Sequence, residues 1–262
     1  MILFRVGSFI KYFLFSRHRK GHGIHSPFVY DLVSRIFRNK IDTDIVFNIE
    51  KLRKKMISDP GTIVVRDLGS GSERMKTSLR KVSDIARYSS VPQKHGVLLA
   101  NMSNEFGKPA ILELGTSFGI STMYLAASCR DAIVYTIEGC PVTYEIATKN
   151  FREAGIQNIK IFNGSFDEIL PVIIKENIKP GLVFIDGNHR KEPVLKYFDQ
   201  ITEISGSKTV IIIDDIYSSC EMAEAWNEIR KNEKVTFTID IFRMGFVFFR
   251  QGVSHFDYII RY

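Results

Sequence analysis

The chain has 262 residues, of which 45% are hydrophobic and 25% are charged, so it can bury a full core and does not have the composition of a disordered or collagen-like polypeptide. Its net charge is +7, but residues 1–40 contain eight Lys/Arg and one acidic residue, and the remaining 28 basic residues meet 28 acidic ones. The excess basic charge therefore belongs to an N-terminal extension and not to the main body.

Cysteine usage and hydropathy indicate a protein of the cytoplasm. The three cysteines, Cys129, Cys140 and Cys220, have no paired spacing, which is typical of reduced thiols. No apolar run reaches the roughly 18 residues that a membrane-spanning helix needs. Arg5 and Lys11 interrupt the apolar start and no small-residue cleavage site follows it, so no signal peptide is expected.

Residues 1–90 predict a basic, helical N-terminal extension. Helices are expected over 1–16, from Pro27 onward with Ser26 as the cap, over 43–57 and over 75–88, with a turn-rich connector at 58–73. The extension has three possible roles: contact with an anionic membrane surface, recruitment of nucleic acid or another acidic partner, or a lid that packs on the main domain or on a second subunit of a homodimer. The lid is favoured because basic faces are common on helices that make no such contacts.

Residues 91–262 predict one α/β domain. After a helix at 92–106, five strand–helix units follow one another, with strands at 109–115, 132–138, 158–164, 181–186 and 208–216. Such a succession is typical of a Rossmann-like, doubly wound and mostly parallel sheet. Two further strand-like runs around Arg243–Gly245 predict a C-terminal antiparallel hairpin, which makes seven strands. Ligands of such sheets bind beyond the carboxyl ends of the strands.

A glycine loop and an acidic residue indicate a nucleoside-containing cofactor. Gly115 and Gly119 lie between the first strand and the first helix, where they let the backbone approach a ligand. Glu138 ends the second strand, where a carboxylate can accept both hydroxyls of a ribose. The loop lacks the middle glycine of the dinucleotide fingerprint, which disfavours a dinucleotide cofactor. Alternatively, the loop is only a tight turn in which glycine allows close packing.

Four segments, ILELGTSFGISTMYLA, VYTIEGCP, NGSFDEILP and GLVFIDGNH, resemble in order and spacing the motifs of class I S-adenosylmethionine-dependent methyltransferases. Over about residues 92–250 the chain most resembles the metal-dependent O-methyltransferases of the catechol and caffeoyl-CoA type. The resemblance implies cofactor contacts by Glu113, Gly115, Thr116, Ser117, Gly119 and Ser121 around the methionine part, by Glu138 and Gly139 at the ribose, by Ser165, Phe166 and Asp167 at the adenine, and by Asp186.

Three carboxylates are expected at the same edge of the sheet, because Asp186 ends the fourth strand and Asp214 and Asp215 end the fifth. Unpaired, they would repel one another, and a hard divalent cation such as Mg²⁺ would resolve the repulsion. The resembled family has metal ligands at these positions, as Asp, Asp and Asn. Alternatively, Asp214 or Asp215 caps the following helix.

His189 follows Asp186 by three residues and can reach the same edge, where the resembled family has a catalytic lysine. Histidine suits general-base catalysis near neutral pH, so we predict that His189 takes a hydroxyl proton and that Asp186 shares the catalytic site. His189 could equally be a solvated loop residue.

Together these features predict an enzyme that transfers a methyl group from S-adenosylmethionine to a small hydroxylated acceptor, assisted by Mg²⁺ or another divalent cation. The alternatives are a metal-independent methyltransferase with another acceptor, an NAD-binding protein, or a cofactor-binding module without turnover. The identity of the acceptor has no readable code in the sequence.

Overall fold

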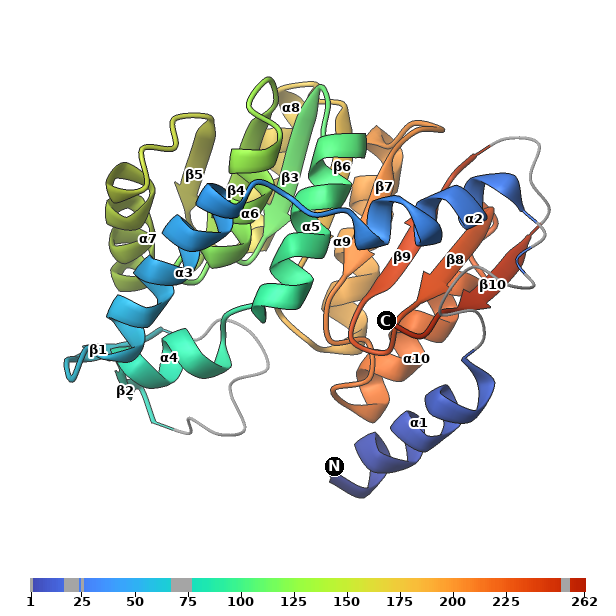
Figure 1. Ribbon diagram of the computed structural model, residues 1–262, viewed down its shortest axis with the longest axis horizontal. Coiled ribbons are helices and arrows are strands. Elements are labelled where there is room, and N and C mark those ends of the chain that lie inside the picture. Colours follow the sequence, from blue (N-terminus) through green and yellow to red (C-terminus); the bar gives the residue numbers. More distant parts are fainter. Residues whose placement is uncertain (1, 17–23, 25, 67–76, 251–254) are drawn as a thin grey trace.

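The structure is a computed structural model that describes residues 2–16, 24, 26–66, 77–250 and 255–262. Its helices and strands alternate through most of the chain (Figure 1). In chain order they are α1 (Ile2–Phe15), α2 (Pro27–Ser34), the 3₁₀ helix η1 (Ile36–Arg38), α3 (Thr43–Ile57), β1 (Thr62–Val64), β2 (Leu79–Lys81), α4 (Val82–Tyr88), α5 (Gln93–Phe106), β3 (Ala110–Leu114), α6 (Ile120–Ser128), β4 (Ile133–Glu138), α7 (Pro141–Glu153), β5 (Ile159–Asn163), α8 (Phe166–Lys175), β6 (Pro180–Ile185), α9 (Lys191–Ile204), β7 (Val210–Ile213), α10 (Cys220–Arg230), β8 (Phe237–Asp240), β9 (Gly245–Phe248) and β10 (Phe256–Ile259). The five units from β3 to α10 confirm the predicted α/β fold.

The main sheet of the described residues has eight strands in the order β10-β8-β9-β7-β6-β3-β4-β5. Strands β3 to β7 are parallel, whereas β9 is antiparallel to its neighbours β7 and β8. The predicted C-terminal hairpin is therefore confirmed. The structure adds an eighth strand, because β10 pairs in parallel with β8. That strand is only four residues long and none of them is buried, so it lacks the apolar run that marks β3 to β7.

The parallel strands are covered on both faces. In β6, Leu182 and Phe184 face a core shared with α2 to α6, whereas Val183 and Ile185 face a second core shared with α8 to α10. All four side chains are buried. Two apolar faces explain why the strands read as continuous apolar runs rather than as alternating patterns.

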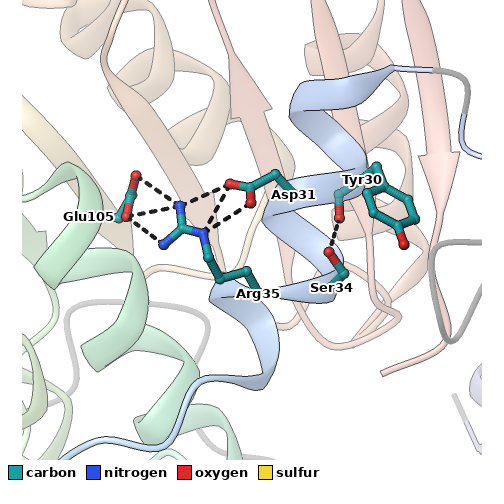
Figure 2. A network of polar contacts seen from close by, with 5 residues as sticks. All are labelled: Tyr30, Asp31, Ser34, Arg35 and Glu105. Atoms are coloured by element: carbon teal, nitrogen blue, oxygen red, sulfur yellow. Dashed lines mark hydrogen bonds and ion pairs between the residues drawn. The ribbon is translucent and has the colours of Figure 1, made fainter.

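The N-terminal extension shares the first of these cores instead of forming its own. Leu32 of α2 and Ile49 of α3 are buried in the same cluster as the sheet. Arg35, directly after α2, pairs with Asp31 at 2.8 Å and with Glu105 of α5 at 3.4 Å (Figure 2). Because these side chains are largely exposed, the network orients α2 against α5 more than it stabilises the fold.

Helix α1 packs against the end of the chain (Figure 1). The Tyr12 hydroxyl donates to the carbonyl of Ile260 at 2.6 Å and accepts from the backbone N–H of Tyr262 at 3.2 Å. The opposite side of α1 is open, and Leu3 and Leu14 are 87% and 70% exposed. Within the described ranges, no helix is both long and apolar enough to cross a membrane. Contacts of the extension with a membrane, a nucleic acid or a second subunit remain predictions.

Residues 77–88 differ from the helix that was expected over 75–88. Helix α4 covers only Val82–Tyr88, and Leu79–Lys81 pairs antiparallel with Thr62–Val64 as a small second sheet. The last part of the predicted connector, 67–73, and the first two residues of the predicted helix, 75–76, lie outside the described residues. Strands of three mostly exposed residues are too short to show an alternating pattern, which explains why the sequence analysis missed them.

Candidate functional site

A cavity of about 1190 Å³ opens at the carboxyl ends of the parallel strands. Strand β3 lies at the point where the chain changes direction across the sheet, with β4 and β5 on one side and β6 and β7 on the other. Open α/β sheets bind their ligands at such a switch point. The loops after the parallel strands form one wall of the cavity, and part of the N-terminal extension forms the other.

The loop between β3 and α6 contains a close backbone approach at Gly115. This residue has φ +102°, and a Cβ atom there would lie 2.0 Å from the carbonyl oxygen of Asp186. The backbone N–H of Asp186 donates to the carbonyl of Leu114 at 2.8 Å, so the ends of β3 and β6 are tied together at this point. A side chain at position 115 would therefore have to push two strands apart.

Glu138, at the end of β4, has a carboxylate held in one orientation at the cavity wall. Its Oε1 accepts hydrogen bonds from the Cys140 N–H at 2.9 Å and from the Thr143 hydroxyl at 2.8 Å. Its Oε2 accepts from the N–H of Ser117, a residue with φ 49°, at 2.7 Å. Each carboxylate oxygen can accept more than one hydrogen bond. The three hydrogen bonds thus fix the direction in which this carboxylate faces the cavity.

Most of the residues predicted to bind the cofactor line this cavity. They are Gly115, Thr116, Ser117, Ser121, Glu138, Gly139, Ser165, Phe166, Asp167 and Asp186. The other two, Glu113 and Gly119, do not line it. Glu113 is fully buried, where its carboxylate accepts from the Thr122 and Thr136 hydroxyls and burial raises its pKa to about 7. Gly119 precedes α6 with φ +82°, and a Cβ atom there would meet Phe151. Both residues therefore pack in the protein interior next to the loop between β3 and α6, and neither faces the cavity.

The segment after β5 is positioned by a helix cap and by aromatic packing. The Ser165 hydroxyl accepts from the N–H of Glu168 at 3.2 Å, and the Glu168 carboxylate accepts from the N–H of Ser165 at 3.0 Å. Phe166 packs edge-on against Tyr197 of α9. A Cβ atom at Gly187 would lie 2.7 Å from the Phe166 ring, so Gly187 makes room for this ring.

Asp186 and His189 meet after β6, as predicted. Nε2 of His189 lies 3.5 Å from Oδ1 of Asp186, and the two side chains are 28% and 18% exposed. Burial acts to lower the pKa of His189. The contact with Asp186 and the charges of Asp215 and Asp214 outweigh burial and raise that pKa to about 9. A pKa of about 9 lies above the neutral range expected from the sequence, and the catalytic role of His189 stays a prediction.

The three carboxylates do not fit a metal ion. Asp214 is fully buried and outside the cavity, and both of its oxygens accept hydrogen bonds from Arg243, at 3.0 Å from Nε and 2.7 Å from Nη2. Asp215 does line the cavity, 3.8 Å from Nη2 of Arg243. In the described part of the chain, no group of three His, Cys, Asp or Glu side chains could hold a metal ion. The sequence analysis assumed unpaired carboxylates, whereas a guanidinium already pairs with Asp214.

Neither aspartate caps the following helix. Ser219 caps α10 by accepting from the N–H of Met222 at 3.1 Å. Arg243 is the residue of this site that the sequence analysis missed. Because β9 is antiparallel to β7, the turn before β9 must lie at the edge where β7 ends. The position of Arg243 in the predicted hairpin was therefore an available signal.

A family described as a methyltransferase domain matches residues 112–216. The O-methyltransferase imqG of Aspergillus flavus is 29% identical over 119 residues, which cover 43% of this chain and 47% of that protein. An uncharacterised protein of Methanocaldococcus jannaschii is 30% identical over 139 residues, which cover 48% of this chain and 50% of that protein. The chain thus matches about half the length of these relatives.

Solved structures share the fold over a larger part of the chain. The O-methyltransferase TomG from Streptomyces achromogenes, in complex with SAM, superposes with a TM-score of 0.56 at 18% identity and covers 80% of this chain and 91% of that one. An O-methyltransferase from Bacillus cereus, in complex with SAH, gives a TM-score of 0.56 at 18% identity and covers 84% and 96%. At such identities the likeness establishes the fold.

Proposed function

We propose that this chain, which carries a methyltransferase domain of class I, transfers a methyl group from S-adenosylmethionine to a hydroxyl oxygen of a small acceptor. One observation carries the proposal: the glycine loop at Gly115, the carboxylate of Glu138 and the pair Asp186–His189 line one cavity at the switch point of the sheet. The O-methyltransferases among the similar proteins support oxygen as the accepting atom.

The residues of the cavity suit this cofactor. The loop at Gly115 brings bare backbone to the cavity, as the methionine part requires, and the carboxylate of Glu138, held in one orientation at the cavity wall, suits the ribose hydroxyls. S-adenosylmethionine supplies an electrophilic methyl group on a sulfonium, and the electron pair of the broken C–S bond stays on sulfur. The protein contributes mainly by positioning, which is worth about 7–11 kcal/mol in well-oriented pairs.

His189 is assigned to the proton. As the acceptor oxygen forms its bond to the methyl carbon, the hydroxyl proton passes to the ring nitrogen of a neutral His189 that does not face Asp186. Asp186 lies 3.5 Å from the other ring nitrogen, Nε2, and stabilises the imidazolium that results. Since the resting imidazole is mainly protonated at pH 7, only a minor fraction of the enzyme is ready to accept the proton there.

The rate of methyl transfer should therefore rise with pH. With a His189 pKa of about 9, kcat/KM should increase about tenfold per pH unit below pH 8 and level off above the pKa. Initial rates over the alkaline and neutral range test this, with folding checked at each pH. The His189→Gln variant, run in parallel, separates titration of the protein from titration of the acceptor. A wild-type rate that is already constant at pH 7 would remove His189 as the base.

Glu138→Gln should weaken binding of S-adenosylhomocysteine roughly 10- to 150-fold, because a hydrogen bond to a charged group contributes about 1.5–3 kcal/mol. Calorimetric titration measures the loss. The matched control is Glu145→Gln, which removes the same charge from an exposed position on α7 outside the cavity. Equal affinities of the two variants, with unchanged thermal unfolding, would contradict the ribose-binding role.

The experiment that tests the function itself combines binding and turnover. The wild type is titrated with S-adenosylhomocysteine and, in competition, with NAD. It is then incubated with S-adenosylmethionine and a panel of phenols, alcohols, amines and thiols, and formation of S-adenosylhomocysteine is followed. Preference for NAD would overturn the proposal in favour of a nucleotide-binding protein. Turnover of amines or thiols alone would retain the methyltransferase and discard oxygen as the acceptor.

A further inference from the structure

Arg243 is held firmly in place by the turn between β8 and β9. Its carbonyl accepts from the N–H of Ile216, the second residue after Asp214, at 3.2 Å. The preceding residue, Phe242, has φ 71° and stacks on Tyr217 with ring centroids 5.4 Å apart. Phe9 of α1 packs edge-on against the same Phe242 ring at 5.1 Å. The backbone from which the guanidinium extends is thus fixed from both sides.

The guanidinium forms a two-point contact with Asp214 that excludes a metal ion from that carboxylate. Both oxygens of Asp214 are occupied by N–H donors, and the carboxylate is fully buried. A metal ligand at this position would require Arg243 to leave. Breaking a buried pair of this kind is strongly unfavourable, because it leaves an uncompensated charge.

The opposite edge of the guanidinium is open to the cavity. The side chain of Arg243 is 30% exposed and lines the cavity together with Asp186, His189 and Asp215. The bonds to Asp214 use Nε and Nη2, and among the described residues Nη1 makes no hydrogen bond. Arg243, held in place by Asp214, therefore brings a positive charge to the cavity that His189 also lines.

We propose that Arg243 takes the place of a divalent cation in this site, where Nη1 binds the acceptor oxygen and stabilises the negative charge that the oxygen acquires. This inference rests on the methyltransferase function proposed above. Donors that are fixed in advance at the point where charge develops stabilise a transition state without reorganising. The fork-shaped contact with Asp214 supplies that fixed geometry.

The substitution of a guanidinium for a metal restricts the acceptor. A divalent metal lowers the pKa of bound water from 15.7 to about 7, whereas a single opposite charge lowers a pKa by only about 1–3. An aliphatic alcohol would stay protonated beside Arg243. A phenolic hydroxyl has an ordinary pKa of about 10, so a lowering of this size lets His189 take its proton. The acceptor class that fits this site is therefore a phenol or a comparably acidic hydroxyl.

The test uses 4-nitrophenol as a probe, because its absorbance distinguishes phenol from phenolate. The full-length protein is saturated with S-adenosylhomocysteine in the presence of EDTA. The absorbance of the bound probe is then measured as the pH is varied, which gives the ratio of phenolate to phenol. In the wild type the ratio of phenolate to phenol should shift about 10- to 1000-fold toward phenolate. In Arg243→Ala/Asp214→Asn the shift should disappear. This double variant avoids leaving an unpaired buried charge, so it tests the guanidinium without unfolding the protein. Arg152→Ala, at an exposed position on α7, is the matched control and should behave as wild type.

Calorimetric titration of Mg²⁺ into the same saturated protein completes the experiment. No saturable heat is expected, and turnover of phenolic acceptors should be unchanged by EDTA. Saturable Mg²⁺ binding that Asp214→Asn abolishes would overturn the inference, and so would a probe shift that needs Mg²⁺ or persists in the double variant. An unshifted probe in the wild type would also overturn it. Failure to bind S-adenosylhomocysteine would instead overturn the proposed function, so the two failures are distinguishable.

Discussion

Replacing His189 by alanine should lower kcat for methyl transfer about 10²- to 10⁴-fold, the range expected when a general base is lost. The imidazole lies 3.5 Å from Asp186 and lines the same cavity as Arg243, so we expect it to reach an oxygen that Nη1 of Arg243 binds. Affinity for S-adenosylhomocysteine should change by less than about threefold, since the cofactor contacts assigned to Glu138 lie on another strand. Initial rates and calorimetry on the same preparations measure both quantities.

His255 provides the matched control for this substitution. It is an exposed histidine near β10, and its Nδ1 lies 3.3 Å from the carbonyl of Val235, away from the cavity. His255→Ala should keep the wild-type kcat. If His189→Ala also kept it, with the protein folded, the imidazole would be only a charged partner of Asp186. A parallel loss of kcat and of cofactor affinity would point instead to a disordered loop after β6.

The parts of the site that the sequence predicts are those determined by local order along the chain. A buried strand followed by a glycine or an acid shows where the strand ends, and parallel strands bring their ends to one edge. Gly115, Glu138 and Asp186 are recognised in this way, and all three line the cavity. Position 115 also requires glycine for a physical reason, because the backbone there is too close to Asp186 for any side chain.

The parts that it does not predict depend on contacts between distant segments. Asp214 and Arg243 are 29 residues apart, and their pairing follows from the way in which β9 lies beside β7. The sequence analysis considered only the negative charges of Asp186, Asp214 and Asp215 and therefore predicted a metal ion. It could not include Arg243, because the position of its hairpin relative to these residues was not known. The position of α1 is a similar case, since Tyr12 contacts a carbonyl 248 residues away.

Two roles of burial were also invisible in the sequence. Glu113 belongs to the same motif as Gly115, but it lies within β3, where its side chain is buried in the core, whereas Gly115 follows the end of the strand at the cavity. The space beside Gly187 is occupied by the ring of Phe166, the first residue of α8. The sequence analysis named Glu113 and Phe166 as site residues, but it could not show which side chains or backbone would surround them.

Gly115→Ala should lower the free energy of unfolding by at least about 3 kcal/mol. A Cβ atom at φ +102° carries the cost of the left-handed region, about 1–2 kcal/mol, and here it also lies 2.0 Å from the carbonyl oxygen of Asp186. That oxygen belongs to a backbone tied to Leu114 by a hydrogen bond of 2.8 Å, so it cannot yield without separating β3 from β6. Urea denaturation of wild type and variant measures the difference.

Gly155→Ala separates the contact from the backbone conformation. Gly155 follows α7 with φ +67°, and a Cβ atom there would meet no atom within 4 Å. This variant should lose only the conformational part, about 1 kcal/mol. Equal losses for the two variants would mean that β3 and β6 can separate at little cost, and the rigid junction between the glycine loop and Asp186 would have to be abandoned. A loss at position 115 that exceeds the loss at position 155 by about 2 kcal/mol, together with weaker binding of S-adenosylhomocysteine, would tie the stability of this junction to its role as the floor of the cofactor site.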